Sequence, residues 1–239
     1  MSDSSTSSSS SGSNGSDPNS SSSTPSAFER WRKKVMFVTG IGVTHEERMQ
    51  DLQQLQNRRC EQMKKELMDT SPLVTFLLRH LRLSGCQVPE SNIFCGTCDP
   101  QAVVGGGSVA HAGGFIPEHG AIKLCGGMFF NKKHVETTIA HELIHMYDQC
   151  KFKVDWKNLR HHACSEIRAN SLSGDCRYTR ELRRGFVAFS KQHQACVRRR
   201  AIVSVTANPA CPDEATAERV VNEVWESCFS DTRPFDEIY

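Results

Sequence analysis

The chain has 239 residues, a formal net charge of +2 and 23% charged residues. This length allows one domain of about 200 ordered residues with a real core, and the near-neutral charge gives no strong field that would attract nucleic acid. No run of about eighteen apolar residues is present, so we expect no segment that crosses a membrane by itself.

The N-terminal segment is mostly serine, with Gly, Asn, Asp and Pro and no apolar cluster. Such a segment cannot offset the entropy lost on ordering. We therefore predict a disordered tail at residues 1–26 and a single domain over residues 27–239, beginning with a short helix at 27–37. The tail is unlike an ordinary mitochondrial presequence, which is rich in arginine, because the first basic residue is Arg30.

Two helix starts follow. Thr44 and Glu47 have the spacing of a capping box, which predicts a long charged helix to about Met68. Ser71 and Pro72 are typical of an N-cap and a first helical position, and they predict a second, more apolar helix.

The stretch 88–125 changes character, with short apolar pieces, many glycines and turn residues. It predicts two to four short strands. The piece HAGGFIPEHGAIKLCGG indicates a hairpin whose turn lies at residues 117–120. The strand at 114–116 or the one at 121–124 could pair with an extended peptide by strand addition, and an ordinary packed hairpin is the alternative.

An H-E-x-x-H motif stands at His141, Glu142 and His145, within a predicted helix at 132–150. On a helix, positions i and i+4 lie on one face. Both imidazoles can therefore reach one zinc ion, with Glu142 beside them to act on a zinc-bound water. A single histidine on the apolar face of a helix would be interpreted as structural. Two histidines that flank a glutamate instead favour a metal site.

A catalytic zinc ion takes a third protein ligand and leaves a position for water. We choose Glu166, which follows His145 by twenty-one residues in a second predicted helix at 159–172. This order resembles the gluzincin class of metalloproteases. We expect an α+β fold, gluzincin-like and mostly helical with a small antiparallel sheet. Asn170, one turn after Glu166, is expected to hold a ligand histidine by a hydrogen bond.

Other third ligands stay open at this point. Asp148 lies one turn past His145, and His161 and His162 are nearby. Glu166 itself would be an ordinary solvated charge if its helix faced the other way, because glutamates are mostly exposed. The remaining sequence predicts one helix at 183–201 and a last one at 212–229.

The pieces GTCDP, GGFIPEHG, AHELIH and HHACSEIRANSLSGDC resemble the mitochondrial inner-membrane protease family that processes ATP synthase subunit 6, some of whose metazoan members carry a Ku-binding name. The resemblance runs from Phe28 to the C-terminus. It implies a zinc-dependent endopeptidase that removes the N-terminal extension of ATP synthase subunit 6 and assists assembly of the ATP synthase membrane sector. It also implies a peripheral position on the intermembrane-space side of the inner membrane.

The eleven cysteines are many for a reduced compartment. The C-x-x-C at residues 95–98 is open to interpretation as half of a zinc knot or a redox pair, but no second C-x-x-C and no thioredoxin-like pattern accompany it. Because the resemblance implies the intermembrane space, we favour disulfides, with at least one thiol left over.

Two other functional classes are considered. A non-enzymatic assembly chaperone is favoured by the charged helix at 44–68, and a repair-associated binding protein by the Ku-linked name of relatives alone. The near-neutral charge gives the second no support.

Overall fold

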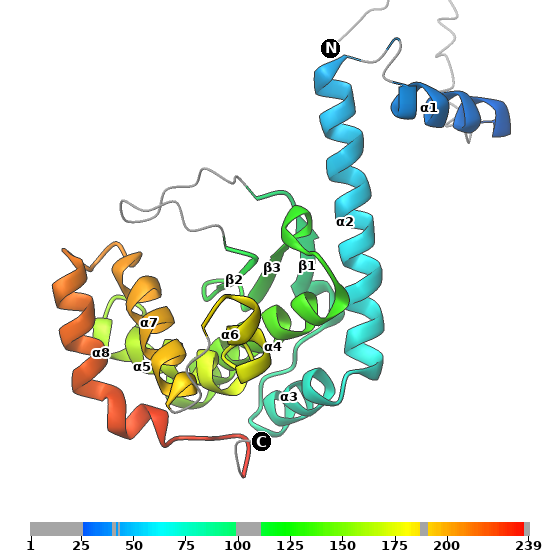
Figure 1. Cartoon of the computed structure of the whole chain (residues 1–239). Coiled ribbons are helices and arrows are strands. Elements are labelled where there is room, and N and C mark those ends of the chain that lie inside the picture. The colour runs from blue at the N-terminus through cyan, green and yellow to red at the C-terminus, as the bar shows by residue number, and fades with distance from the viewer. Residues whose placement is uncertain (1–25, 40–41, 43, 99–110, 187–190, 237–239) are drawn as a thin grey trace, which may run out of the picture. The chain divides into compact units, whose positions relative to one another are not determined.

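The computed structural model describes residues 26–39, 42, 44–98, 111–186 and 191–236 (Figure 1). The chain divides into two compact units, Met1–Arg48 and Met49–Tyr239, which are described separately. The predicted tail at 1–26 lies outside the described residues except for Ser26, and the single domain over 27–239 stays a prediction. Within the described part of the chain, no helix combines the length and apolar character needed to cross a membrane.

The first unit contains helix α1 (Ala27–Thr39) and the start of helix α2 (His45–Thr70). The predicted capping box of α2 is formed: the Thr44 N–H donates to Glu47 Oε2 at 2.9 Å, and the Glu47 N–H donates to Thr44 Oγ1 at 3.2 Å. Two N–H groups that lack helical partners at the start of α2 are thereby hydrogen-bonded. This explains why the start of the helix could be predicted from the sequence.

The second unit continues α2 and then adds short strands and further helices. In chain order these are α3 (Pro72–Leu83), β1 (Ile93–Gly96), β2 (Gly113–Ile116), β3 (Ala121–Cys125), α4 (Lys132–Phe152), α5 (Leu159–Leu172), α6 (Tyr178–Arg183), α7 (Gln192–Thr206) and α8 (Glu214–Phe229), with short 3-10 turns at Glu90–Asn92 and Gly126–Met128.

The three strands form one sheet in the order β1-β3-β2. Ile122 of β3 pairs with Phe115 of β2 in the predicted antiparallel hairpin and with Ile93 of β1 in a parallel pair. The α+β class is confirmed, but the wholly antiparallel sheet is corrected to a mixed one. Parallel neighbours need a long connection, and the chain between β1 and β3, which includes β2, provides it.

Two buried clusters hold the second unit together. One gathers the end of α2, α3, the sheet and α4 around residues such as Leu77, Ile122 and Leu143. The other gathers α5, α7 and α8 around residues such as Ile167 and Val221. Since α4 also contacts α5, these two helices lie where the clusters meet (Figure 1).

Polar caps set the bounds of these two helices. Asn131 begins α4, its side chain accepting a backbone N–H from the first turn, and Lys153 ends it with a left-handed φ of 52°. Asn158 begins α5 in the same way. The first helix thus runs two residues beyond the predicted 132–150, and the second has the bounds 159–172.

The predicted helix at 183–201 is wrong at its start. The chain forms the short α6 first and begins α7 only at Gln192. Gly185 lies between them with φ +89°, a conformation that ends a helix and that glycine adopts without strain. The last predicted helix starts at Glu214 instead of Pro212, because Asp213 is its cap.

Ten cysteines pair, as the disulfide interpretation predicts. The bonds join Cys60 to Cys95, Cys86 to Cys150, Cys98 to Cys125, Cys164 to Cys228 and Cys176 to Cys196. Cys211 is the free thiol. The two cysteines of the C-x-x-C have different partners, so this motif is neither a redox pair nor half of a zinc knot.

Candidate metal centre

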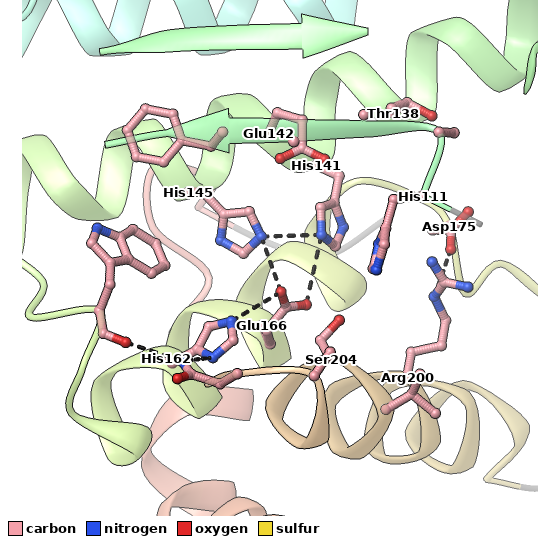
Figure 2. Close-up of a pocket in the computed structure, with 18 of the residues that line it drawn as sticks. His111, Thr138, His141, Glu142, His145, His162, Glu166, Asp175, Arg200 and Ser204 are labelled. Atoms are coloured by element: carbon pink, nitrogen blue, oxygen red, sulfur yellow. Dashed lines mark hydrogen bonds and ion pairs between the residues drawn. The ribbon is translucent and has the colours of Figure 1, made fainter. Parts of the chain in front are cut away.

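His141, His145 and Glu166 converge (Figure 2). One ligand atom from each lies within 4.8 Å of the others. The two Nε2 atoms are 3.1 Å apart, and the Glu166 carboxylate oxygens lie 3.6 Å from the first and 3.4 Å from the second. Two imidazoles and one carboxylate are a donor set that suits zinc and related divalent metals.

The tautomer of His145 follows from its neighbours. Its Nδ1 lies 2.8 Å from Ser165 Oγ, and that hydroxyl donates to Asp148 Oδ2 at 2.8 Å. A hydroxyl has one proton, so Ser165 must accept a hydrogen bond from the Nδ1–H of His145. In the neutral ring the lone pair of Nε2 therefore faces His141 and Glu166, as metal binding requires.

Glu166 is held from two sides. The Asn170 amide donates to Glu166 Oε2 at 3.1 Å and to its backbone carbonyl at 2.8 Å. His162 Nε2 lies 3.5 Å from Glu166 Oε1, and its Nδ1 accepts from the Asn208 amide at 2.9 Å. The ring proton of His162 is consequently on Nε2, facing the carboxylate. The prediction that Asn170 orients a ligand histidine is wrong, because it orients the glutamate.

The alternative third ligands have other contacts. Asp148 bonds Ser165 and the Arg168 guanidinium, the latter at 3.0 Å. His161 accepts the Asp155 backbone N–H at 3.1 Å. His162 is used in holding Glu166. The geometry therefore favours Glu166 as the third donor.

The electrostatics of the cluster suit a cation. Burial, together with the neighbouring His145, lowers the pKa of His141 to about 4. For His145 burial also lowers the pKa, but Glu166 outweighs it and the net pKa rises to about 9. The two histidines together thus accept one proton beside the Glu166 carboxylate and resist a second. A buried carboxylate next to two imidazoles is satisfied when a cation occupies the centre.

Glu142 lies beside the cluster, on the side of β2 (Figure 2). It is only 6% exposed. Burial raises the pKa of Glu142 to about 7, although His145 and a hydrogen bond from the Phe115 backbone act in the opposite direction. A carboxyl group with a pKa near neutrality can both accept and release a proton.

The cluster opens into a cavity of about 1450 Å³. Residues of β2, α4, α5 and α7 line it. The sequence did not indicate Ser165 or the α7 residues Arg200 and Ser204 as parts of this region, and it indicated His162 only as an alternative metal ligand. The i,i+4 spacing of His162 and Glu166 could have suggested that His162 contacts this carboxylate.

A helix that carries paired histidines and a glutamate, a third carboxylate from the next helix and an open cavity define the class of HExxH metallopeptidases. Residues 58–236 match the model of the Peptidase M76 family. The chain belongs to this family, and it is a metallopeptidase.

Three similar proteins carry the name mitochondrial inner membrane protease ATP23. The one from Yarrowia lipolytica is 46% identical over 225 residues, which cover 91% of this chain and 86% of the relative. Those from Malassezia globosa and Neosartorya fischeri are 52% and 53% identical, covering 75% and 76% of this chain and 76% and 73% of theirs. No solved structure matches the chain.

Proposed function

We propose that the chain is a zinc-dependent endopeptidase of the mitochondrial intermembrane space, bound peripherally to the inner membrane. Its substrate would be the N-terminal extension of ATP synthase subunit 6, and it would also assist assembly of the membrane sector. The observation that carries the proposal is the convergence of His141, His145 and Glu166 beside Glu142 in an open cavity. The names of the relatives support a location at the mitochondrial inner membrane, and the family resemblance alone supports the substrate.

The residues have distinct roles in this hydrolysis. A zinc ion held by His141, His145 and Glu166 would supply Lewis-acid chemistry that polarises the scissile carbonyl and makes water more acidic. Glu142 takes the proton of the attacking water as general base and returns it to the leaving amine. Ser165 keeps His145 in the tautomer whose Nε2 faces the centre.

The substrate backbone has a candidate binding edge. Strand β3 is paired on both sides, so among the described strands only β2 offers an edge next to α4. Gly113, Gly114 and Phe115 of β2 also line the cavity. An extended peptide added to β2 would gain main-chain hydrogen bonds with little demand on its side chains.

Helix α1 supplies a candidate surface for membrane contact. Phe28, Trp31, Val35 and Val38 recur at helical spacing and are exposed. Arg32 and Lys34 lie on the same helix and are also exposed. A short helix with an aromatic and aliphatic stripe and basic flanks suits the interface of an anionic membrane.

A second function, assistance in assembly without cleavage, is favoured by the exposed face of α2. Met49, Leu52 and Leu55 follow one another at three-residue spacing and remain exposed. Apolar side chains grouped in this way are typical of a protein-binding surface.

The test uses Glu142→Gln with His145→Ala as its contrast. We expect Glu142→Gln to keep bound metal and lose cleavage of the subunit 6 precursor, and His145→Ala to lose both. Complementation in cells with Glu142→Gln then separates the two functions. If the subunit 6 precursor accumulates while the ATP synthase membrane sector still assembles, the chain has an assembly role that is independent of cleavage. Normal processing by Glu142→Gln would contradict the proposed mechanism.

A further inference from the structure

The fold gathers basic residues that the sequence keeps apart. Arginines occur in one run at residues 177–184 and in another at residues 198–200. The first run covers α6 and its ends, the second lies on α7, and these helices contact each other. In a chain of net charge +2 this region is therefore strongly basic.

Four of these arginines line the cavity of the metal centre and form what we call the arginine wall: Arg180, Arg184, Arg199 and Arg200. Two carboxylates accompany them, Asp175 in the cavity lining and Glu181 fully buried behind it. Four guanidinium groups against two carboxylates leave an excess of two positive charges.

The ion pairs do not account for this excess. Asp175 is contacted by Arg200 at 2.7 Å, by Arg180 at 2.9 Å and by Arg184 at 3.3 Å. One arginine is enough to neutralise one buried carboxylate, so a purely structural network would not require three here.

Arg199 forms one ion pair, and its guanidinium lies over the Phe186 ring at 4.1 Å. Its Nη2 bonds Glu181 at 2.9 Å, while 39% of its side chain stays exposed. Glu181 keeps Arg184 and the Gln192 amide as further partners. A guanidinium has five N–H donors in a planar fork that matches a carboxylate, and Arg199 therefore retains capacity for a ligand.

The wall faces the reaction centre. Figure 2 shows the Asp175–Arg200 pair beside His111, on the side of His141 that is away from His162. The positive field extends across the cavity: burial first, and the charge of Arg180 next, lower the pKa of His134, which lines the same space.

We propose that the arginine wall is a binding subsite for an acidic side chain of the peptide substrate, an aspartate or glutamate close to the scissile bond. The inference rests on the proposed endopeptidase function and names a feature of its substrate. A carboxylate in this place would receive charge-assisted hydrogen bonds and offset the excess positive charge.

Cleavage of a peptide library by the zinc-loaded full chain gives the first measurement, with products identified by mass spectrometry. We expect Asp and Glu to be enriched at one fixed distance from the cleaved bond. Matched peptides with Glu or Gln at that position should then differ in kcat/KM on the order of threefold to tenfold, as for partly exposed ion pairs. The difference should shrink at high salt.

The variant is Arg199→Gln, and the matched control is Arg198→Gln. Both remove one positive charge from α7 and one guanidinium that stacks on an aromatic ring, but Arg198 does not line the cavity. Arg199→Gln should bring the Glu-to-Gln ratio toward one, whereas Arg198→Gln should keep the ratio of the natural chain. Equal ratios in both variants and the natural chain would overturn the subsite.

A measurement of peptide binding tests the arginine-wall subsite separately from the endopeptidase function. In the Glu142→Gln background, fluorescence anisotropy of a labelled Glu-containing library peptide and its Gln counterpart reports affinity without turnover. If the acidic peptide binds more tightly than its Gln counterpart and Arg199→Gln abolishes the difference, the subsite is supported, whether or not the natural chain cleaves any peptide. A complete lack of cleavage by the natural chain would count against the endopeptidase function alone. Cleavage or binding without any preference for the acidic peptide refutes the subsite alone.

Discussion

A buried chain of hydrogen bonds ties His145 to the C-terminal segment. It runs from Ser165 to Asp148 and then to Arg168, and each of these side chains is almost fully buried. Arg168 in turn contacts the Asp231 carboxylate at 2.6 Å and its carbonyl at 2.7 Å. Because buried polar groups are costly when unpaired, this chain holds the imidazole in one orientation and one tautomer.

Replacing Ser165 by Ala tests this orientation. Loss of the hydroxyl leaves the Nδ1–H of His145 and one oxygen of Asp148 without their partner, and we expect zinc affinity to fall on the order of 10- to 100-fold. Competition with a chelating dye measures the change. Ser171→Ala, also at a buried position on α5 but with the hydroxyl near His193, is the control and should leave the affinity unchanged. Equal affinities in the two variants would contradict the positioning role.

The pH dependence of stability has a clear source at Asp175. Burial raises the pKa of this carboxyl, but Arg200, Arg180 and Arg184 outweigh it and lower the net pKa below the ordinary 3.8. A lowered pKa in the folded state stabilises the fold above the ordinary value, and this contribution is lost as the pH falls through the folded pKa.

Asp175→Asn is therefore expected to be less stable than the natural chain at neutral pH, with the difference shrinking in acid below about pH 4. Urea unfolding at a series of pH values measures it. A stability difference that grows as the pH falls would show that the sign is wrong.

The sequence indicates the candidate donors but not their surroundings. The i,i+4 spacing of His141 and His145 is a local property of one helix, and it could be read directly. The contacts of Ser165 with His145 and of Asn208 with His162 join different elements. They depend on how helices pack, which no local pattern encodes.

At the scale of elements, boundaries with a chemical cap were predictable and pairings were not. The capping box of α2 and the Ser71 and Pro72 start of α3 are formed as predicted. The parallel pairing of β1 with β3 depends on strands that are distant in the chain. The break at Gly185 was missed because one glycine among arginines is a weak signal.

Helix α1 carries its own prediction. The double variant Trp31→Asn and Val35→Asn removes half of the exposed apolar stripe, so binding to vesicles containing about 20% cardiolipin should weaken severalfold. Co-sedimentation measures it, with Leu83→Asn on α3 as an exposed apolar control. Undiminished sedimentation of the double variant would rule out α1 as the membrane contact.

At the scale of the whole molecule, disulfides join elements that are far apart in sequence. Cys164–Cys228 links α5 to α8, and Cys86–Cys150 links the segment after α3 to the end of α4. Each closes a loop between residues 64 positions apart, and bonds of this kind typically stabilise a fold by about 2–4 kcal/mol. The two helices of the metal centre are thus each anchored by a covalent bond.

Alkylation of the unfolded but unreduced protein should label one cysteine, Cys211, and reduction should expose the other ten. Mass spectrometry counts the labels and peptide mapping locates them. Labelling of all eleven cysteines before reduction would contradict the disulfide framework.

The most direct test of the account is the metal content of the chain purified without chelators. We expect about one zinc ion per chain, peptidase activity that stops with phenanthroline and returns with added zinc, and loss of metal in Glu166→Ala but not in His161→Ala, whose imidazole bonds Asp155. A metal-free protein that still cleaves peptides, and is indifferent to phenanthroline, would contradict the account.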